Sequence, residues 1–311
     1  MTDQTRTAAE TEWTLDALAD LYAYPVVDAG GSGGEGTGAG LGTGAGTGPG
    51  GDAGTGTGPG GSPDAGAQPG ADASTRPCGD AAAPPRGGAG AGVWLRANMV
   101  STLDGAAQHD GLSQALSSAA DMRIFGTLRA LADAVVVGAE TVRQEGYRPA
   151  RAREAFAARR AAAGQRPAPA IAVVTASLDL DFSLPLFTEP LVPTLVLTGA
   201  AAPADRVLAA RKAGAEVLVA GDGAGVDPVR AVRALAGRGL RRLLAEGGPR
   251  LLGQFLAAGV LDELCLTLSP TLTSGYAQRI TGGPALAVPE RFALASLLEE
   301  DGFLFSRYRR A

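Results

Sequence analysis

The sequence predicts an α/β fold with a mostly parallel central sheet flanked by helices. Two runs of consecutive apolar residues, 133–138 (DAVVVG) and 170–175 (AIAVVT), have the length of strands that are buried on both faces. Segments with helical spacing of apolar residues alternate with such runs along residues 93–311. Strands that alternate with helices form parallel sheets, and ligands bind at the carboxyl ends of these strands. The residues just after each strand are therefore the candidates for a functional site.

A glycine-rich segment, residues 28–92, separates a short N-terminal part from the main body. It holds 25 of the chain's 46 glycines and consists mostly of Gly, Ala, Pro, Thr and Asp. This composition cannot bury enough apolar surface to offset the entropy of ordering the chain, so we expect a disordered insertion. Residues 93–311 are long enough for one domain with its own core.

The N-terminal part, residues 1–27, contains one predicted helix. Residues 13–24 (WTLDALADLYAY) have apolar side chains three and four positions apart, which is typical of a helix. We expect this helix to dock on the main domain. The alternative is a frayed terminus, because chain ends are often poorly ordered.

The main domain is expected to begin with a strand at 93–99, which runs into the turn STLDG. The next predicted helix, 117–132, has Ser117 or Ser118 as its N-cap and Asp121 in its first turn. Its larger apolar residues are predicted to share one face: Met122, Phe125, Leu128 and Leu131.

The remaining elements continue the alternation. The predicted strands are 133–138, 170–175, 193–199, 215–221, 241–246, 260–270 and 303–310, and the predicted helices begin at 138 or occupy 204–214, 227–239 and 249–259. On the last strand, Arg307, Arg309 and Arg310 surround Tyr308, and we interpret this pattern as a solvated sheet edge.

Composition excludes several classes of function. The net charge is -5 and no basic face stands out, so nucleic acid is not an expected partner. No apolar run is long enough for a membrane span, and the N-terminus lacks the charged-then-apolar order of a signal peptide. Cys78 and Cys265 suggest neither a disulfide framework nor a metal site, which favours a cytoplasmic protein.

The chain has one histidine, His109, in a polar loop. One histidine and two cysteines supply too few ligands for a zinc site, and no G-x-S-x-G motif accompanies a possible catalytic triad. We interpret His109 as a solvated surface residue. The chemistry is therefore expected to come from a cofactor.

The strongest candidate site is the segment AEGGPRLLG, residues 245–253. A predicted strand ends at Glu246, two glycines follow, and a helix opens at Pro249 or Arg250. Glycines let a phosphate approach the backbone, and free amides at a helix start favour an anion. Glu246 can bind an amine or hydroxyl of a substrate. A tight turn with an exposed glutamate is the alternative.

A second candidate follows the strand at 133–138. Thr141 and Glu145 lie four residues apart on a predicted helical turn and hence on one face. Both are also ordinary helix-start residues. Arg129, in the preceding helix, is a surface charge or an anion anchor, and without further information we interpret it as surface.

Four segments, in this order, resemble the C-terminal reductase domain of bacterial riboflavin biosynthesis proteins. They are NMVSTLDGAA, the S-x-x-L-S-S loop, LRALADAVVVGAETVRQEG and LLAEGGPRLLGQFLAAGVLDELCLTLSP. The resemblance covers roughly residues 93–310 and is greatest to the stand-alone pyrimidine reductases of high-GC bacteria. In those relatives little sequence separates the LYAYP helix from the first strand, so the glycine-rich segment is expected to be an insertion.

This resemblance implies a dihydrofolate-reductase-like fold, a homodimer and the cofactor NADPH. The family reaction reduces the ribosyl group of a 5-amino-6-ribosylamino-uracil 5′-phosphate, or of the related diaminopyrimidinone, to ribityl. By motif position, Ser113, Arg129 and Glu246 are expected to contact the substrate, with Arg129 on its phosphate. The residues expected to contact NADPH are Thr141, Glu145, Gly247, Gly248, Pro249, Arg250, Leu251, Leu252 and Gly253.

The chain departs from the family pattern at four places. Glu145 replaces the family's aspartate, Ala115 replaces an aromatic residue, and Ala106 replaces a lysine. The family's D-P-x-L-T-x-R run is GYRPAR here, so Arg148 or Arg151 is expected to substitute for its arginine. Two alternatives stay open: reduction of another pterin-like or heterocyclic substrate, and nucleotide binding without turnover.

Overall fold

The computed structural model describes residues 13–25, 92–283 and 285–311. The predicted insertion at 28–92 falls, except for Gly92, outside these residues, as does Cys78. Within the described ranges, no helix has the length and apolar character needed to cross a bilayer.

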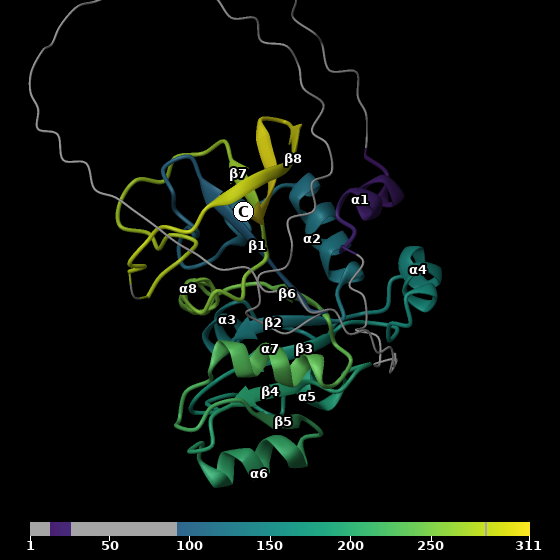
Figure 1. The fold of residues 1–311 in the computed structure, drawn as a ribbon, viewed down its shortest axis with the longest axis vertical. Coiled ribbons are helices and arrows are strands. Elements are labelled where there is room, and N and C mark those ends of the chain that lie inside the picture. The colour runs from purple at the N-terminus through teal and green to yellow at the C-terminus, as the bar shows by residue number, and fades with distance from the viewer. Residues whose placement is uncertain (1–12, 26–91, 284) are drawn as a thin grey trace, which may run out of the picture. The chain divides into compact units, whose positions relative to one another are not determined.

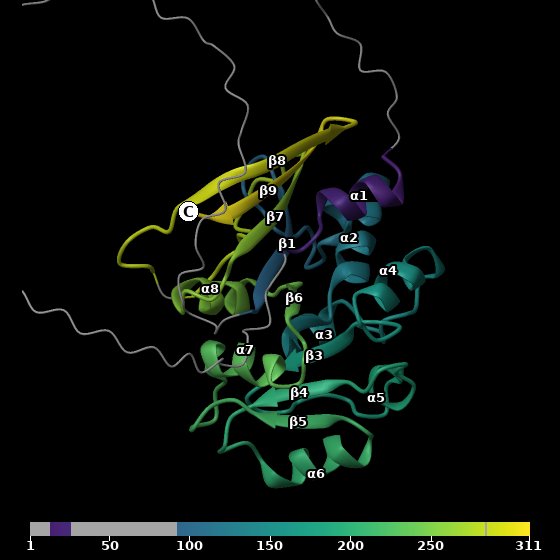
Figure 2. The same cartoon turned by 45° about the vertical axis from the view of Figure 1, so that its right-hand side comes forward.

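One sheet of nine strands organises the described chain, in the order β5-β4-β3-β2-β6-β1-β7-β9-β8 (Figures 1 and 2). The pairs from β5 through β7 are parallel, whereas β9 is antiparallel to both β7 and β8. This confirms the predicted α/β class with a mostly parallel sheet. The strands are β1 (Trp94–Thr102), β2 (Ala134–Gly138), β3 (Ala170–Val174), β4 (Leu195–Thr198), β5 (Glu216–Val219), β6 (Arg242–Ala245), β7 (Glu263–Ser269), β8 (Phe292–Glu300) and β9 (Phe303–Arg310).

Helices cover both faces of the sheet. They are α1 (Leu15–Leu21), α2 (Ala119–Leu131), α3 (Ala139–Gln144), α4 (Ala157–Ala162), α5 (Pro185–Thr188), α6 (Ala204–Lys212), α7 (Pro228–Ala236) and α8 (Pro249–Ala257), with 3-10 turns η1 (Gln114–Leu116) and η2 (Glu154–Phe156). Ser118 caps α2, because its side chain accepts a hydrogen bond from the amide of Asp121. Pro228 and Pro249 occupy the first positions of α7 and α8, where the missing N–H costs no hydrogen bond.

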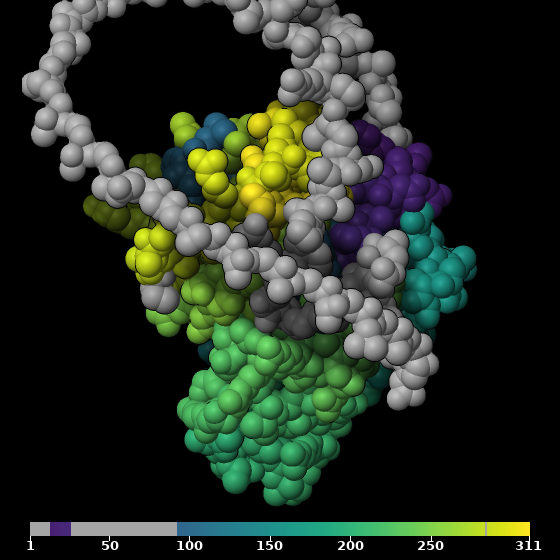
Figure 3. Space-filling model, in the orientation of Figure 1, coloured from purple at the N-terminus to yellow at the C-terminus, as the bar shows by residue number. Residues whose placement is uncertain are grey.

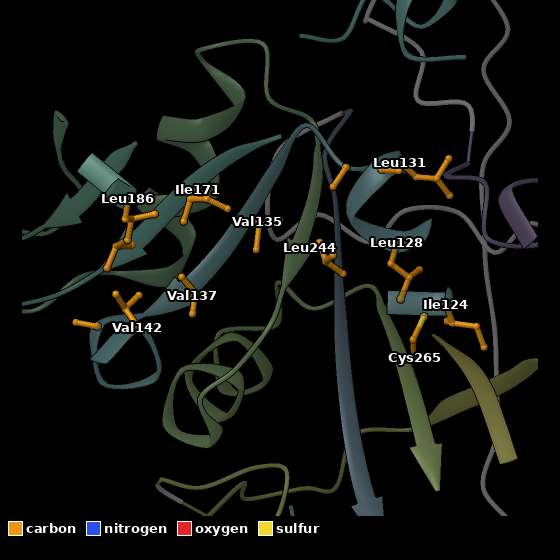
Figure 4. Close-up of a cluster of buried hydrophobic side chains, with 14 of the residues drawn as sticks. Ile124, Leu128, Leu131, Val135, Val137, Val142, Ile171, Leu186, Leu244 and Cys265 are labelled. Carbon is orange, nitrogen blue, oxygen red and sulfur yellow. The ribbon is translucent and has the colours of Figure 1, made fainter. Parts of the chain in front are cut away.

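Two cores result from the alternation of side chains along each strand. Val135 and Val137 of β2 face the core under α2, together with Ile171 of β3 and Leu128 of α2 (Figure 4). The intervening residues of the same strands, such as Val136, face a second core, which α7 and α8 cover. Strands buried on both faces explain the continuous apolar runs in the sequence.

The helix α1 packs against α2, with Leu18 and Tyr22 about 1% exposed. The buried guanidinium of Arg96 donates a hydrogen bond of 2.8 Å to the carbonyl oxygen of Tyr22. Arg159 of α4 forms an ion pair of 2.8 Å with Asp20. Accordingly, the purple α1 residues and the teal α4 residues lie next to each other in Figure 3.

The predicted solvated edge at the last strand is wrong. β9 lies between β7 and β8, and β8 was not among the predicted strands. Arg307 is 7% exposed and lies 3.7 Å from the carboxylate of Glu263, while Arg309 lies 3.5 Å from it. Glu263 itself is fully buried and accepts a hydrogen bond of 2.7 Å from Arg96. Ion pairs with this carboxylate therefore compensate for the burial of the charges.

Candidate functional site

A pocket of about 640 Å³ lies where β2 and β6 end. Its walls come from the middle of β1, from η1, from one face each of α2 and α3, from the loop at 146–153 and from the glycine turn before α8. Parallel sheets bind ligands at this edge, because loops from neighbouring strands meet there. Eight of the predicted site residues line the pocket: Ser113, Arg129, Thr141, Glu145, Glu246, Gly247, Gly248 and Pro249.

Glu246 and Arg129 form a bidentate pair in this pocket. Arg129 Nε donates to Glu246 Oε1 at 2.7 Å, and Arg129 Nη2 donates to Oε2 at 2.5 Å. The Glu246 side chain is 3% exposed and the Arg129 side chain is 24% exposed. Two parallel charge-assisted bonds fix the orientation of both groups. The structure therefore brings together two residues that were both predicted to contact the substrate.

Aromatic rings hold the Arg129 guanidinium in place. Its central carbon lies 4.5 Å from the ring centre of Phe125 and 5.1 Å from that of Tyr147, and the Tyr147 hydroxyl donates to Glu246 Oε2. Burial opposes the charge on Arg129, but the Glu246 carboxylate outweighs this effect and raises the pKa of Arg129. Burial and the same carboxylate raise the pKa of Tyr147 well above its usual value. Arg129 therefore stays charged and Tyr147 stays protonated across the physiological range.

The turn between β6 and α8 passes close to the start of α3. Gly247 has a φ of 95°, its carbonyl accepts from the amide of Gly138 at 3.2 Å, and a cis peptide bond joins it to Gly248. A Cβ atom on Gly248 would lie 2.9 Å from Thr141 Oγ1, which is closer than side chains normally approach. Only glycine fits both positions without rearrangement.

Free backbone amides surround this turn. Within the described residues, the amides of Gly248, Arg250 and Leu251 have no acceptor, and no side chain caps α8. Together with the close approach that the glycines allow, these donors suit the phosphates of a dinucleotide. The turn and the first residues of α8, residues 247–251, therefore form a cradle that suits the phosphate groups of a cofactor.

The other α8 residues that were expected to contact NADPH do not line the pocket. Leu251 and Leu252 are 7% and 2% exposed and pack in the core under α7 and α8. A Cβ on Gly253 would lie 1.9 Å from the carbonyl oxygen of Gly282, so this glycine permits close packing of two backbone segments. Arg250 is exposed and, like these three residues, does not line the pocket. A contact of this segment with a cofactor would involve backbone atoms.

Ser113 and Glu145, predicted to contact different ligands, contact each other. The backbone amide and the hydroxyl of Ser113 donate to Glu145 Oε1 at 3.2 and 3.1 Å. The hydroxyl group lies at the pocket rim, where it joins the loop before η1 to the end of α3.

Comparisons with known proteins agree with this arrangement. Residues 93–299 match the RibD C-terminal domain family, which is two thirds of the chain. The chain belongs to the RibD C-terminal domain family. Its fold is accordingly dihydrofolate-reductase-like, as the family resemblance implied. A pyrimidine reductase-like protein from Corynebacterium diphtheriae is 30% identical, with a TM-score of 0.64 over 70% of this chain and 92% of that one.

Curated relatives of this RibD C-terminal domain carry one name. They are called 2,5-diamino-6-ribosylamino-4(3H)-pyrimidinone 5′-phosphate reductases. The Aquifex aeolicus relative is 33% identical over 148 residues, which are 48% of this chain and 61% of that protein. The Archaeoglobus fulgidus relative is 28% identical over 179 residues, which are 57% of this chain and 80% of that protein.

Two residues that line the pocket of this RibD C-terminal domain were not predicted to belong to the site. Tyr147, which binds Glu246, follows the strand at 133–138 by nine positions and was not singled out, although an aromatic beside the Thr141–Glu145 turn was a usable signal. Asp121 was predicted only as a helix-start residue. It is 7% exposed, lines the pocket, and accepts hydrogen bonds from Ser117 and from Thr267, the latter at 2.6 Å.

His109, which we interpreted as a solvated surface residue, lies outside the pocket. The His109 side chain is 56% exposed, lies 3.6 Å from Asp110, and does not line the pocket. In the described ranges, no group of His, Cys, Asp and Glu residues is arranged to hold a metal ion.

Proposed function

We propose that the protein is an NADPH-dependent reductase of riboflavin biosynthesis. Its substrate would be a 5-amino-6-ribosylamino-pyrimidine 5′-phosphate, whose ribosyl group becomes ribityl. The observation that carries the proposal is the bidentate Arg129–Glu246 pair, held at the carboxyl end of β6 directly beside the Gly247–Gly248 turn. The names of the relatives support the same substrate class. A bound reduced nicotinamide ring supplies the hydride that the reaction requires.

Glu246 has the hydrogen-bonding capacity to orient the pyrimidine. A carboxylate offers about four lone-pair sites. Oε1 accepts one bond from Arg129, and Oε2 accepts one from Arg129 and one from Tyr147. A free site on Oε1 is thus left for an N–H group of the substrate. Because Arg129 and Tyr147 hold the carboxylate, its geometry is fixed before the substrate binds.

Thr141, Glu145 and the turn at Gly247–Gly248 would hold the cofactor. The cradle leaves amides of the first turn of α8 free for phosphate oxygens, as described above. Ser113, which is hydrogen-bonded to Glu145, joins this half of the pocket to the substrate half. We expect the proton for the sugar to come from water or from a pocket carboxyl group.

The proposal also extends to the assembly, the location and the partners of the protein. We expect a homodimer in the cytoplasm, with a small pyrimidine nucleotide as its partner and with no role in binding nucleic acid. The net charge of -5 supports the last point, because a polyanion is repelled by a chain of this charge.

The direct test is an assay with purified protein, NADPH and the ribosylaminopyrimidine phosphate, followed by the absorbance of the reduced cofactor. We expect oxidation that depends on the substrate. No oxidation under conditions in which a known reductase turns over would reject the assignment. Rescue of a riboflavin auxotroph that lacks only its reductase separates this substrate from other heterocycles, since a reductase for a different compound would not restore growth.

A further inference from the structure

Asp121 is a buried carboxylate that lines the pocket without a cationic partner. It is 7% exposed and lies in the first turn of α2. Its Oδ1 accepts a hydrogen bond of 2.6 Å from the Thr267 hydroxyl, and its Oδ2 accepts one from the Ser117 hydroxyl. Within the described ranges, no lysine, arginine or histidine forms an ion pair with Asp121, and the nearby Arg123 is bound to Glu300. Because buried carboxylates need compensating partners, this one suits a ligand with hydrogen-bond donors.

Two hydroxyl groups fix the orientation of the Asp121 carboxylate. Thr267 lies on β7 and Ser117 lies just before the N-cap of α2, so the carboxylate is held from two elements. A carboxylate has about four lone-pair sites, and the hydroxyls occupy one on each oxygen. One site on each oxygen is left, and two parallel N–H donors fill such a pair of sites. An amidine-type edge of a heterocycle, in which a ring N–H adjoins an exocyclic amino group, has this shape.

Asp121 is placed to meet the far edge of a ring that Glu246 holds. Asp121 and Arg129 lie eight residues apart on α2, which is about 12 Å along a helix axis, and Glu246 is bound to Arg129. Met122 and Phe125, between them on the helix, line the same pocket. One pyrimidine ring with a hydrogen bond of about 2.9 Å at each end spans a length of this order. The two carboxylates therefore suit opposite edges of one ring.

We infer that Asp121, held by Ser117 and Thr267, binds the pyrimidine edge formed by N3–H and a 2-amino group. The inference rests on the proposed function, because it specifies which ribosylaminopyrimidine phosphate the pocket accepts. A 2-amino-4-pyrimidinone presents two donors to the carboxylate, whereas a uracil presents N3–H and the C2 oxygen, which the carboxylate repels. Asp121 therefore selects the 2-amino compound over the uracil. Ser117 and Thr267 are positioning residues, since they act through Asp121.

Two fragments that differ only at C2 test this selection without turnover. They are 2,6-diaminopyrimidin-4(3H)-one and 6-aminouracil, and their dissociation constants are measured by ligand-observed NMR titration of the full chain. We expect the wild-type protein to bind the diaminopyrimidinone about tenfold or more tightly, because the uracil leaves a buried acceptor unpaired. Asp121→Asn should reverse this order, since an amide offers a donor to the C2 oxygen and an acceptor to N3–H.

Further variants separate selection from a structural role. Asp205→Asn, on the exposed side of α6, is the matched control and should keep the wild-type order. Thr267→Val removes one of the two hydroxyls and should reduce the preference several-fold without reversing it. A carboxylate with a structural role alone would lower the melting temperature of Asp121→Asn and leave the ratio of the two dissociation constants unchanged.

Wild-type protein that binds neither fragment, or both equally, would overturn the inference whether or not Asp121→Asn folds. An Asp121→Asn variant that keeps the wild-type order would also overturn it. Failure of the proposed function gives a different result. Selective binding without reduction of either ribosylated pyrimidine would retain the subsite and reject the reductase, whereas equal kcat/KM for the two would retain the reductase and reject the subsite.

Discussion

Arg129 and Glu246 are 117 residues apart in the sequence, yet the guanidinium of one makes two hydrogen bonds with the carboxylate of the other. The pair joins α2 to the end of β6, so it connects the packing of a helix to the geometry of the pocket. Both side chains line the pocket, Glu246 almost fully buried and Arg129 partly exposed, and each compensates for the burial of the other's charge.

Replacing Glu246 is expected to affect both stability and activity. Glu246→Gln leaves Arg129 partly buried without its counter-ion, so the free energy of unfolding should fall by about 1–3 kcal/mol. We expect kcat/KM to fall by about 100-fold, because the substrate loses its orienting carboxylate. Urea denaturation and steady-state kinetics measure the two effects.

The double variant Arg129→Met/Glu246→Leu separates the two roles. Apolar replacement of a buried pair is often close to neutral for stability, so we expect most of the lost stability to return while activity stays low. Activity that recovers together with stability would show that the pair has only a structural role.

Gly248→Ala tests the close approach of the glycine turn to α3. The added Cβ would meet Thr141 Oγ1 at 2.9 Å, so we expect KM for the nicotinamide cofactor to rise about tenfold with a smaller change in KM for the pyrimidine. The same clash should lower the free energy of unfolding, and the additional change Thr141→Ala, which removes the clashing oxygen, should restore it. If Gly248→Ala alone leaves cofactor affinity unchanged, the turn is not the cofactor cradle.

Asp262 gives a prediction on pH. Burial raises the pKa of this carboxyl group to about 6 from its ordinary 3.8, although its Oδ2 accepts a bond of 2.7 Å from the amide of Leu95. The folded state therefore binds more protons than the unfolded state between these values, and stability should fall as pH rises from about 4 to about 6. Asp262→Asn should reduce this slope and raise stability at pH 7 by about 1–2 kcal/mol.

Thermal unfolding across pH 4 to 7 measures the effect. Asp205→Asn, at an exposed position on α6, is the control. Equal slopes for wild type and Asp262→Asn would mean that the carboxyl group titrates normally in the folded protein.

Glu263 is expected to be essential for stability, because it is fully buried and neutralises Arg96 directly, with Arg307 and Arg309 within 4 Å. Glu263→Gln should lower the free energy of unfolding by about 3–5 kcal/mol. Glu189→Gln, on the surface after α5, should have no measurable effect. Equal denaturation midpoints for the two variants would mean that Glu263 does not stabilise the buried arginines.

Local signals were sufficient to predict much of the fold. The strand β6, its two glycines and the proline that opens α8 follow one another directly, and each has a strong local preference. Strands β2 and β3 were predictable because burial on both faces leaves a continuous apolar run. In contrast, most side chains of β8 are exposed, so the sequence did not predict this strand. Without β8, the last predicted strand, β9, was interpreted as the edge of the sheet.

The site was harder to predict, because its contacts join distant segments. On α2, Leu128 and Leu131 face the core, whereas Met122 is 49% exposed and lines the pocket with Phe125 and Arg129. One helix thus has two apolar faces, and the single predicted face merged them. Family resemblance assigned Arg129 to the substrate, but only the structure shows that Glu246 and Tyr147 bind one another beside it.

In the proposed reaction, a nicotinamide cofactor held in this pocket would supply a hydride to C1′ of the ribosyl group, while Glu246 orients the pyrimidine. The most direct measurement uses NADPH labelled with deuterium on the transferring position and mass spectrometry of the product. We predict one deuterium at C1′ of a ribityl product from the wild-type protein, and little product from Glu246→Gln. Cofactor oxidation without deuterium in the ribityl chain, or no ribityl product at all, would contradict the account.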